Sequence, residues 1–141
     1  GCVALARGLG RQEARETLAH ECMHGIFYSQ PAVRAACAAF WAERAGEEGR
    51  EAWSSFLADF GYDTGNEGLV LNEFFAYMTT ETRLFGSPKP SLKSLGRRTD
   101  KAGGGRRMEL LRELQREFNA FIRDLVPGPR PRLDKGTCLL E

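Results

Sequence analysis

The sequence predicts a mainly α-helical fold with at most one small β element near the N-terminus. Helical patterns recur along most of the 141 residues, and Gly or Pro residues separate them. The one candidate strand is the short apolar run CVALA at residues 2–6, which GLG interrupts soon afterwards. Hydrophobic residues make up 42% of the chain and charged residues 28%, as in an ordinary globular domain. We therefore expect a single domain whose core is built by helices.

Five segments carry the helical pattern. The first ends at the sequence SQP, because the residue before a proline avoids the helical backbone region, and Pro31 suits the first turn of the second. The second is rich in alanine and apolar on most sides, so we expect it to be well buried. Gly61 is typical of the C-terminal end of a helix, here the third. The predicted helices cover residues 12–28, 31–44, 50–60, 69–84 and 106–126.

The rest of the chain lacks a clear hydrophobic period. Residues 86–105 are basic and rich in Gly, Pro and Ser, which predicts a mobile loop or linker. Residues 127–141 begin PGPRPR, which favours an extended tail. We expect one domain at residues 1–126, containing the 86–105 loop, followed by a C-terminal tail at 127–141.

Composition argues against several classes of partner. The net charge of +1 gives no electrostatic reason to expect nucleic acid or an anionic membrane. The longest apolar stretch, AVRAACAAFWA, contains Arg34 and is too short to span a bilayer. The chain opens at Gly1 without a recognisable signal peptide, so we expect a segment of a longer precursor, with export of that precursor left open. Neither the compartment nor the oligomeric state can be read from the sequence.

The four cysteines do not form a metal-binding pattern. Cys2, Cys22, Cys37 and Cys138 include no CxxC pair, which argues against a zinc ribbon. Cys22 and Cys37 fall within apolar helical segments, so we interpret both as small buried hydrophobic residues. A disulfide between Cys2 and Cys138 would join the two ends of the chain, but no pattern specifically favours it.

The strongest chemical signal is HECMH at residues 20–24, which contains both histidines of the chain. Residues four apart lie on one face of a helix, so His20 and His24 can direct two imidazoles at one zinc ion. Glu21 is offset by about 100° around the helix axis, which suits a base beside the metal-bound water better than a ligand. Gly25, directly after His24, removes side-chain bulk near the metal. The spacing thus supplies two ligands and a general base, as the HExxH motif requires.

A catalytic zinc site needs a third protein ligand, and no third histidine exists. Glu43 and Glu73 are the competing carboxylates. Glu43 ends a helix in the context WAERAG, which is typical of a charged helix terminus. Glu73 lies among apolar residues in NEFFAYM, where a carboxylate is costly unless it is paired or binds a metal. We favour Glu73, with Ala76 allowing its helix to approach the HExxH helix closely.

The two sequence pieces TLAHECMHG and LNEFFAYM together resemble the gluzincin metallopeptidases, the thermolysin-like clan. Residues 72–76 are similar to the NExFA pattern of its aminopeptidase branch. The resemblance implies an α+β zincin-like fold in a compact member, with the HExxH helix packed at its centre. It also implies that His20, His24 and Glu73 bind Zn²⁺ and that Glu21 activates water. The gap in sequence between His24 and Glu73 is longer than the corresponding gap in thermolysin. The gap between His24 and Glu43 matches a spacing found in some thermolysin-like enzymes. No counterpart of the aminopeptidase exopeptidase signature is present, so trimming from the amino end is not supported.

Hydrolysis of a peptide also needs a donor for the oxyanion that forms at the carbonyl. Gluzincins usually use a tyrosine or a histidine for this role. The candidates here are Tyr28, Tyr62 and Tyr77, with Arg83 as an outsider, and the sequence does not decide between them.

The function that the sequence favours is a zinc-dependent metallopeptidase acting on a peptide or protein, with Glu21 as the general base. The alternative is an inactive zinc-binding module with a binding or regulatory role. A deformylase-like hydrolase is a weaker third reading, because HECMHGIF is similar to its motif. That family needs an upstream EGC sequence, and Cys2 has no Glu before it.

Overall fold

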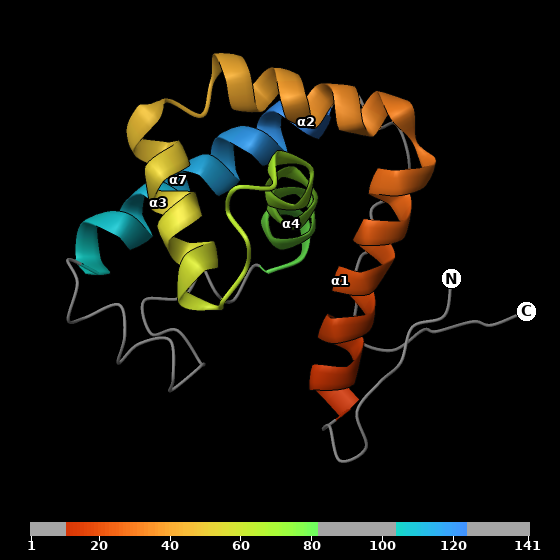
Figure 1. The fold of residues 1–141 in the computed structure, drawn as a ribbon. Helices are drawn as coiled ribbons and strands as arrows, with labels where there is room; N and C mark the ends of the chain where they lie inside the picture. The colour runs from red at the N-terminus through yellow and green to blue at the C-terminus, as the bar shows by residue number, and fades with distance from the viewer. Residues whose placement is uncertain (1–10, 82–103, 124–141) are drawn as a thin grey trace, which may run out of the picture.

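The computed structural model describes residues 11–81 and 104–123, and every statement about the structure refers to these residues. They form five helices and no strand, which confirms the mainly α fold class (Figure 1). The helices are α1 (Arg11–Ser29), α2 (Pro31–Glu43), α3 (Glu47–Asp59), α4 (Glu67–Thr80) and α7 (Gly104–Arg123). The candidate strand at residues 2–6, the tail at 127–141 and most of the 86–105 loop lie outside the described residues.

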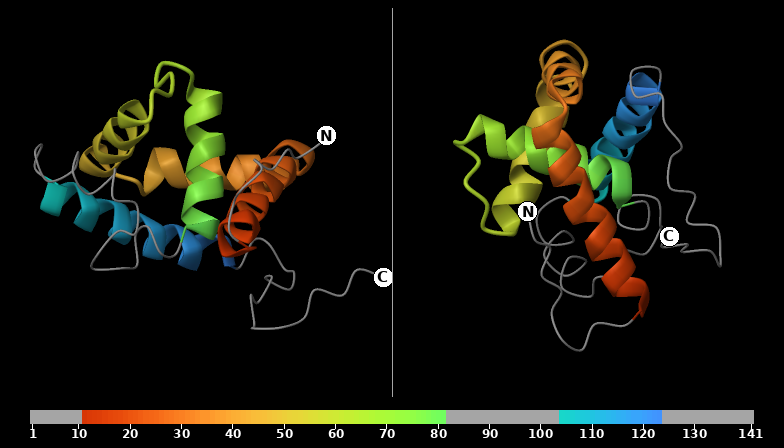
Figure 2. Two further views of the ribbon diagram at one scale, coloured as in Figure 1. Left: turned by 90° about the horizontal axis from the view of Figure 1, so that it is seen from below. Right: turned by 90° about the vertical axis from the view of Figure 1, so that its right-hand side faces the viewer.

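Helix α4 occupies the middle of the fold, and α1, α2, α3 and α7 each pack against it (Figures 1 and 2). Its sequence explains this position, because eight of its residues are buried, including Phe74, Phe75 and Met78. We expected the HExxH helix at the centre. That helix is α1, and it lies at one side of α4, because Phe27 is its one buried residue among those whose burial is described.

Aromatic rings join the helices around α4. Phe74 is fully buried and contacts Phe40 and Trp41 of α2, Trp53 of α3 and Phe118 of α7. Large rings bury much apolar area, and stacked or edge-to-face pairs of this kind add about 0.5–1.5 kcal/mol beyond that area. One aromatic cluster thus fixes α4, and with it Glu73, relative to the rest of the core.

The helix boundaries follow the local signals with small shifts. Helix α2 starts at Pro31 as expected, and Gly61 follows α3 with the positive φ of +82° that favours glycine. Helix α3 starts at Glu47, before the expected 50, and its first turn contains acidic residues that suit a helix N-terminus. Helix α4 starts at Glu67 because Asn66 caps it, the Leu69 amide donating to Asn66 Oδ1 at 3.1 Å.

The end of α4 and the start of α7 correct two expectations. Helix α4 ends at Thr80, short of the expected 84, and α7 begins at Gly104, inside the segment expected to be a loop. Asn119 Nδ2 donates to the Met78 carbonyl at 2.8 Å, so α7 satisfies a carbonyl in the last turn of α4.

The two described cysteines differ in environment. Cys37 is fully buried as expected, and desolvation raises the pKa of its thiol to about 12. Cys22 is exposed, which corrects the expectation that it is a buried hydrophobic residue. The reason is its place on α1, where Met23, Ile26 and Phe27, and not Cys22, pack against the core.

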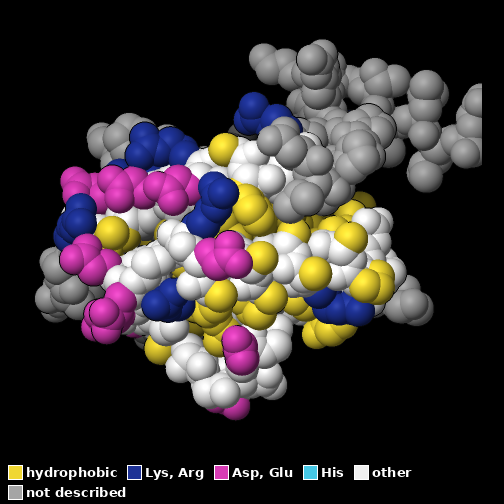
Figure 3. Space-filling view, turned by 90° about the horizontal axis from the view of Figure 1, so that it is seen from above, with side chains coloured by type: hydrophobic (Ala, Val, Ile, Leu, Met, Phe, Trp, Pro, Cys, Tyr) yellow, Lys and Arg dark blue, Asp and Glu magenta, His cyan; other side chains and the backbone are white. Residues whose placement is uncertain are grey.

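The described surface carries both charge signs. On the face in Figure 3, acidic and basic side chains lie next to one another with apolar atoms between them. Two ion pairs join α7 to α3, Arg106 to Glu48 at 3.0 Å and Arg107 to Asp59 at 2.7 Å. None of the described helices has the length and apolar character needed to cross a membrane.

Candidate metal centre

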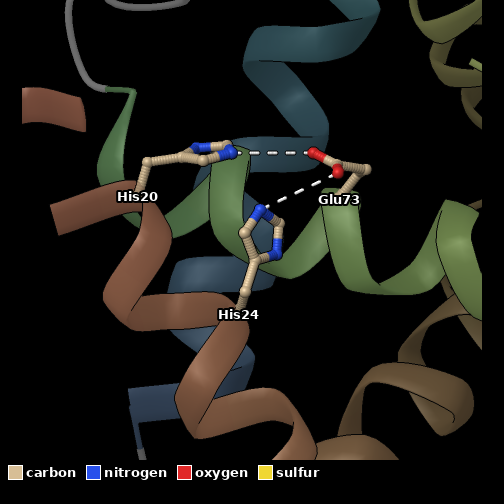
Figure 4. A group of neighbouring side chains, drawn as sticks. All are labelled: His20, His24 and Glu73. Carbon is tan, nitrogen blue, oxygen red and sulfur yellow. Dashed lines mark ion pairs between the residues drawn. The ribbon is translucent and has the colours of Figure 1, made fainter. Parts of the chain in front are cut away.

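Three side chains from two helices converge at the contact between α1 and α4. His20 and His24 lie one turn apart on α1, and Glu73 of α4 faces both (Figure 4). The Nε2 atom of His20 lies 3.6 Å from one carboxylate oxygen of Glu73, and that of His24 lies 3.7 Å from the other. One potential ligand atom from each residue lies within 4.8 Å of the others, so the three could hold one metal ion.

The separations fit zinc better than they fit direct hydrogen bonds. Two ligand atoms at tetrahedral positions, with bonds of about 2.0–2.2 Å, lie about 3.4 Å apart. The two nitrogen–oxygen distances of 3.6 and 3.7 Å, each to a different oxygen of the carboxylate, are close to that value, and the ligand atoms of the whole group lie within 4.8 Å of one another. Both are too long for good N–H···O hydrogen bonds, whose usual length is about 2.9 Å. The donor set of two imidazoles and one carboxylate is also one that catalytic zinc uses.

Burial makes the carboxylate of Glu73 costly without a cation. The residue is 8% exposed, and its Oε2 atom is buried without a hydrogen-bond partner. Within residues 11–81 and 104–123, no Lys or Arg is paired with it. A buried polar group without a partner costs about 1–3 kcal/mol, and a charged one costs more. A metal ion between the imidazoles and this oxygen would remove that cost.

Glu43, the competing carboxylate, is exposed at the last position of α2 and is not part of the group of three. The structure therefore brings Glu73, and not Glu43, to the histidines. The steric role expected of Gly25 has no support, because a Cβ atom built there would meet nothing within 4 Å.

A hydrogen-bonded pair behind His24 fixes the direction of its ring. His24 Nδ1 lies 3.0 Å from Asn72 Oδ1, and Asn72 Nδ2 donates to the Tyr28 hydroxyl at 3.2 Å. With Nδ1–H donating to the amide oxygen, Nε2 carries the free lone pair that a metal needs. Sequence reasoning quoted Asn72 only as part of a motif and missed this contact. The available signal was a buried polar residue next to the carboxylate ligand.

We predict that Asn72→Ala weakens zinc binding by about 10- to 100-fold, because the His24 ring loses the acceptor that orients it. Competition with a chromophoric zinc chelator measures the dissociation constant. Asn66→Ala is a matched control, since Asn66 caps the same helix away from the histidines. An Asn72→Ala protein that binds zinc as tightly as the Asn66→Ala protein would show that the amide does not orient the ligand.

The described tyrosines occupy different places around the centre. The Tyr28 side chain is engaged with Asn72 on the His24 side, and the Tyr77 ring packs edge-on against His20 with centroids 4.7 Å apart. A hydrogen bond links the Tyr77 and Tyr62 hydroxyls, and burial is the main cause that raises the pKa of Tyr77. Arg83 lies outside the described residues.

The Tyr62 hydroxyl lies in the electrostatic field of the centre. Burial is the largest cause that raises the pKa of Tyr62, and the charge of Glu73 is the next. The hydrogen bond with Tyr77 lowers this pKa, and the charge of Glu21 raises it. The backbone holds Tyr62 firmly, since its amide donates to Leu57 O at 3.2 Å across the glycine turn that ends α3.

Glu21 is exposed on α1, next to His20 in the chain. Its carboxylate is close enough to Tyr62 for its charge to raise the pKa of that hydroxyl. Glu21 and Tyr62 are therefore within electrostatic range of each other, whereas Asn72 and Tyr28 are linked by a hydrogen bond on the His24 side.

Comparison with protein-family models, curated proteins and solved structures found no match to this chain. The interpretation of the site therefore rests on its own geometry and chemistry.

Proposed function

We propose that this chain is a zinc-dependent metallopeptidase in which His20, His24 and Glu73 hold the metal. The observation that carries the proposal is the convergence of two imidazole Nε2 atoms on the two oxygens of one buried carboxylate. The resemblance of HECMH and NEFFAYM to the gluzincins supports the same assignment. A zinc ion bound there supplies a Lewis acid that lowers the pKa of bound water to about 7 and polarises a substrate carbonyl.

The chain's own residues then have separate roles. Glu21 takes the proton from the attacking water and returns it to the amine nitrogen of the leaving group, so it acts first as a base and then as an acid. Its exposed position next to His20 suits this role, because the carboxylate must reach both water and the leaving group. Glu73 and Asn72 stay in place during the reaction because they are buried, and the Asn72 amide holds the His24 ring.

Tyr62 is the tyrosine that we assign as donor to the carbonyl oxygen as it gains negative charge. The assignment is supported by its position within the fields of Glu73 and Glu21 and by the raised pKa, which keeps the phenol protonated as a donor. Tyr28 is less suitable because its hydroxyl contacts Asn72, and the Tyr77 hydroxyl is bound to Tyr62.

Tyr62→Phe should lower kcat/KM by about 100- to 1,000-fold, the usual loss when one oxyanion donor is removed. Zinc affinity should stay within about threefold of the wild type, because the phenol is not a ligand. Tyr28→Phe is the matched control and should keep kcat near the wild-type value. Equal activity of the Tyr62→Phe protein and this control would exclude Tyr62 as the donor.

The test of the proposed function starts with the full chain purified without added metal. Metal analysis should find about one zinc per chain, and a mixed peptide library should be cleaved at internal bonds. Removing zinc with a chelator should stop cleavage, and adding zinc back should restore it. A chain that binds one zinc and cleaves no peptide in the library would contradict the peptidase.

That last outcome would favour the alternative, a zinc-binding module without turnover. Two hollows on the described surface, of about 360 and 320 Å³, are lined by residues of α3 and α7 and of the turn before α3.

A further inference from the structure

The other ring nitrogen of His20 lacks a partner in the described part of the chain. Figure 4 shows one nitrogen of His20 on the line to Glu73 and the second on the far side of the ring. That second atom, Nδ1, is buried without a hydrogen-bond partner. If Nε2 binds the metal, Nδ1 must carry the proton, so His20 needs an acceptor there just as His24 uses Asn72.

The two helices run in opposite directions across their contact, and this order identifies the acceptor. Going back along α1 from its C-terminal end, Tyr28 is hydrogen-bonded to Asn72 of α4, and His24 lies against Glu73. One turn further back, the His20 ring packs against the Tyr77 ring. On α4, residues at four-residue spacing share one face, so Glu81 follows Tyr77 on the face that carries Glu73. The neighbour of Glu81 on α1 is Glu16, one turn before His20.

Side-chain direction separates the two candidate carboxylates. Side chains on a helix lean towards its N-terminus, so the His20 ring leans from α1 towards the turn that contains Glu16. Glu81 closes α4 as its C-cap, and its side chain leans back towards Tyr77 and therefore towards His20. The Glu16 side chain leans away from His20. Geometry thus favours Glu81 as the acceptor.

The surroundings of Glu81 agree with this position. Glu81 is half-buried, and this burial is the main cause that raises the pKa of its carboxyl group. The charge of His20 lowers that pKa, and the charge of Glu16 raises it. Gln115 of α7 donates to the Glu81 carbonyl at 3.4 Å and to the Met78 carbonyl at 3.2 Å, which holds the end of α4 in place. The carboxylate is therefore near enough to His20 and Glu16 for their charges to act on it, and its backbone is fixed.

In this structure neither Glu81 nor any other described residue accepts a hydrogen bond from His20 Nδ1. We propose that in the metal-bound chain the Glu81 carboxylate turns to accept a hydrogen bond from His20 Nδ1–H and so holds the ring with Nε2 towards the metal. Glu81 is then a positioning residue that acts through His20, on the opposite side of the centre from Asn72. The inference rests on the zinc centre of the proposed function, and it adds a carboxylate that the HExxH pattern alone does not supply.

The test measures zinc affinity and the Nδ1 proton of the full chain, without any peptide. Glu81→Ala should raise the zinc dissociation constant by about 10- to 100-fold. Glu81→Gln keeps an amide oxygen as an acceptor and should recover part of that loss. Glu16→Gln is the matched control, one helix turn from His20, and should change the constant by less than about threefold.

Nitrogen-15 NMR of the zinc-loaded chain gives a readout that a purely structural role of Glu81 would not move. The wild type should show a slowly exchanging His20 Nδ1–H signal, which Glu81→Ala should lose and Glu81→Gln should keep. If Glu81→Ala fails to fold, Glu81→Gln is compared with the wild type. The change from a charged to an amide acceptor should then alter both the chemical shift of the Nδ1–H signal and the zinc dissociation constant.

Two results would overturn the inference. One is a folded Glu81→Ala protein that keeps the Nδ1–H signal and binds zinc as the wild type does. The other is a larger loss in Glu16→Gln than in Glu81→Ala. Either result leaves the peptidase proposal standing, since Glu81 takes no part in proton transfer. A wild-type chain that binds no zinc would overturn both proposals together.

Discussion

Glu21→Gln is expected to abolish peptide hydrolysis while one zinc ion stays bound. The substitution keeps the size and shape of the side chain but removes the carboxylate that accepts a proton from water. General-base catalysis contributes about 100- to 10,000-fold to the rate, so kcat should fall by at least about 100-fold. The zinc ligands are unaffected, because Glu21 points to solvent from the α1 position next to His20. Steady-state kinetics and metal analysis of the same preparation measure both quantities.

Glu43→Gln is the control for the loss of one acidic charge, since Glu43 is exposed at the end of α2 and outside the centre. Its kcat should equal the wild-type value. Retained activity in Glu21→Gln would remove Glu21 from the mechanism. Loss of zinc together with activity would instead make Glu21 a structural part of the site.

Glu73→Gln should remove stoichiometric zinc. Glu73 is the one carboxylate among the described residues that faces both histidines, so its loss leaves two imidazoles and only solvent. Because replacing a residue that merely supports a ligand already costs about 10- to 100-fold, loss of the ligand itself should weaken zinc binding by more than about 100-fold. Equilibrium dialysis against buffered zinc, at several free concentrations, measures the change.

The fold of the Glu73→Gln protein must be checked, because Glu73 is buried in the central helix. Its far-UV circular dichroism should match the wild type, since Gln has nearly the same volume and four helices still surround α4. Glu43→Gln again serves as the control and should keep full zinc occupancy. If Glu43→Gln loses zinc and Glu73→Gln keeps it, the ligand set is wrong.

The features that sequence predicted well are set by neighbours in the chain. Pro31 and Gly61 mark helix ends through their own backbone preferences, and the structure has both ends there. The pairing of His20 with His24 follows from helix geometry alone. Glu73 was favoured because a carboxylate in an apolar run needs a partner, and the structure places it against the two histidines.

Features that depend on the packing of distant segments could not be predicted in this way. The contact between His24 and Asn72 joins α1 to α4, and nothing local to either residue specifies it. The exposure of Cys22 and the central place of α4 depend on which helix faces pack together. The sequence also does not distinguish the three tyrosines, because their positions relative to the centre depend on how α1, α4 and the turn after α3 pack together.

X-ray absorption at the zinc edge tests the central claim most directly, using the full chain loaded with one equivalent of zinc. The account predicts two imidazole nitrogens at about 2.0–2.1 Å, with carboxylate and water oxygens completing a four-coordinate shell. A sulfur neighbour at about 2.3 Å, or a shell without two imidazoles, would contradict a centre built from His20, His24 and Glu73.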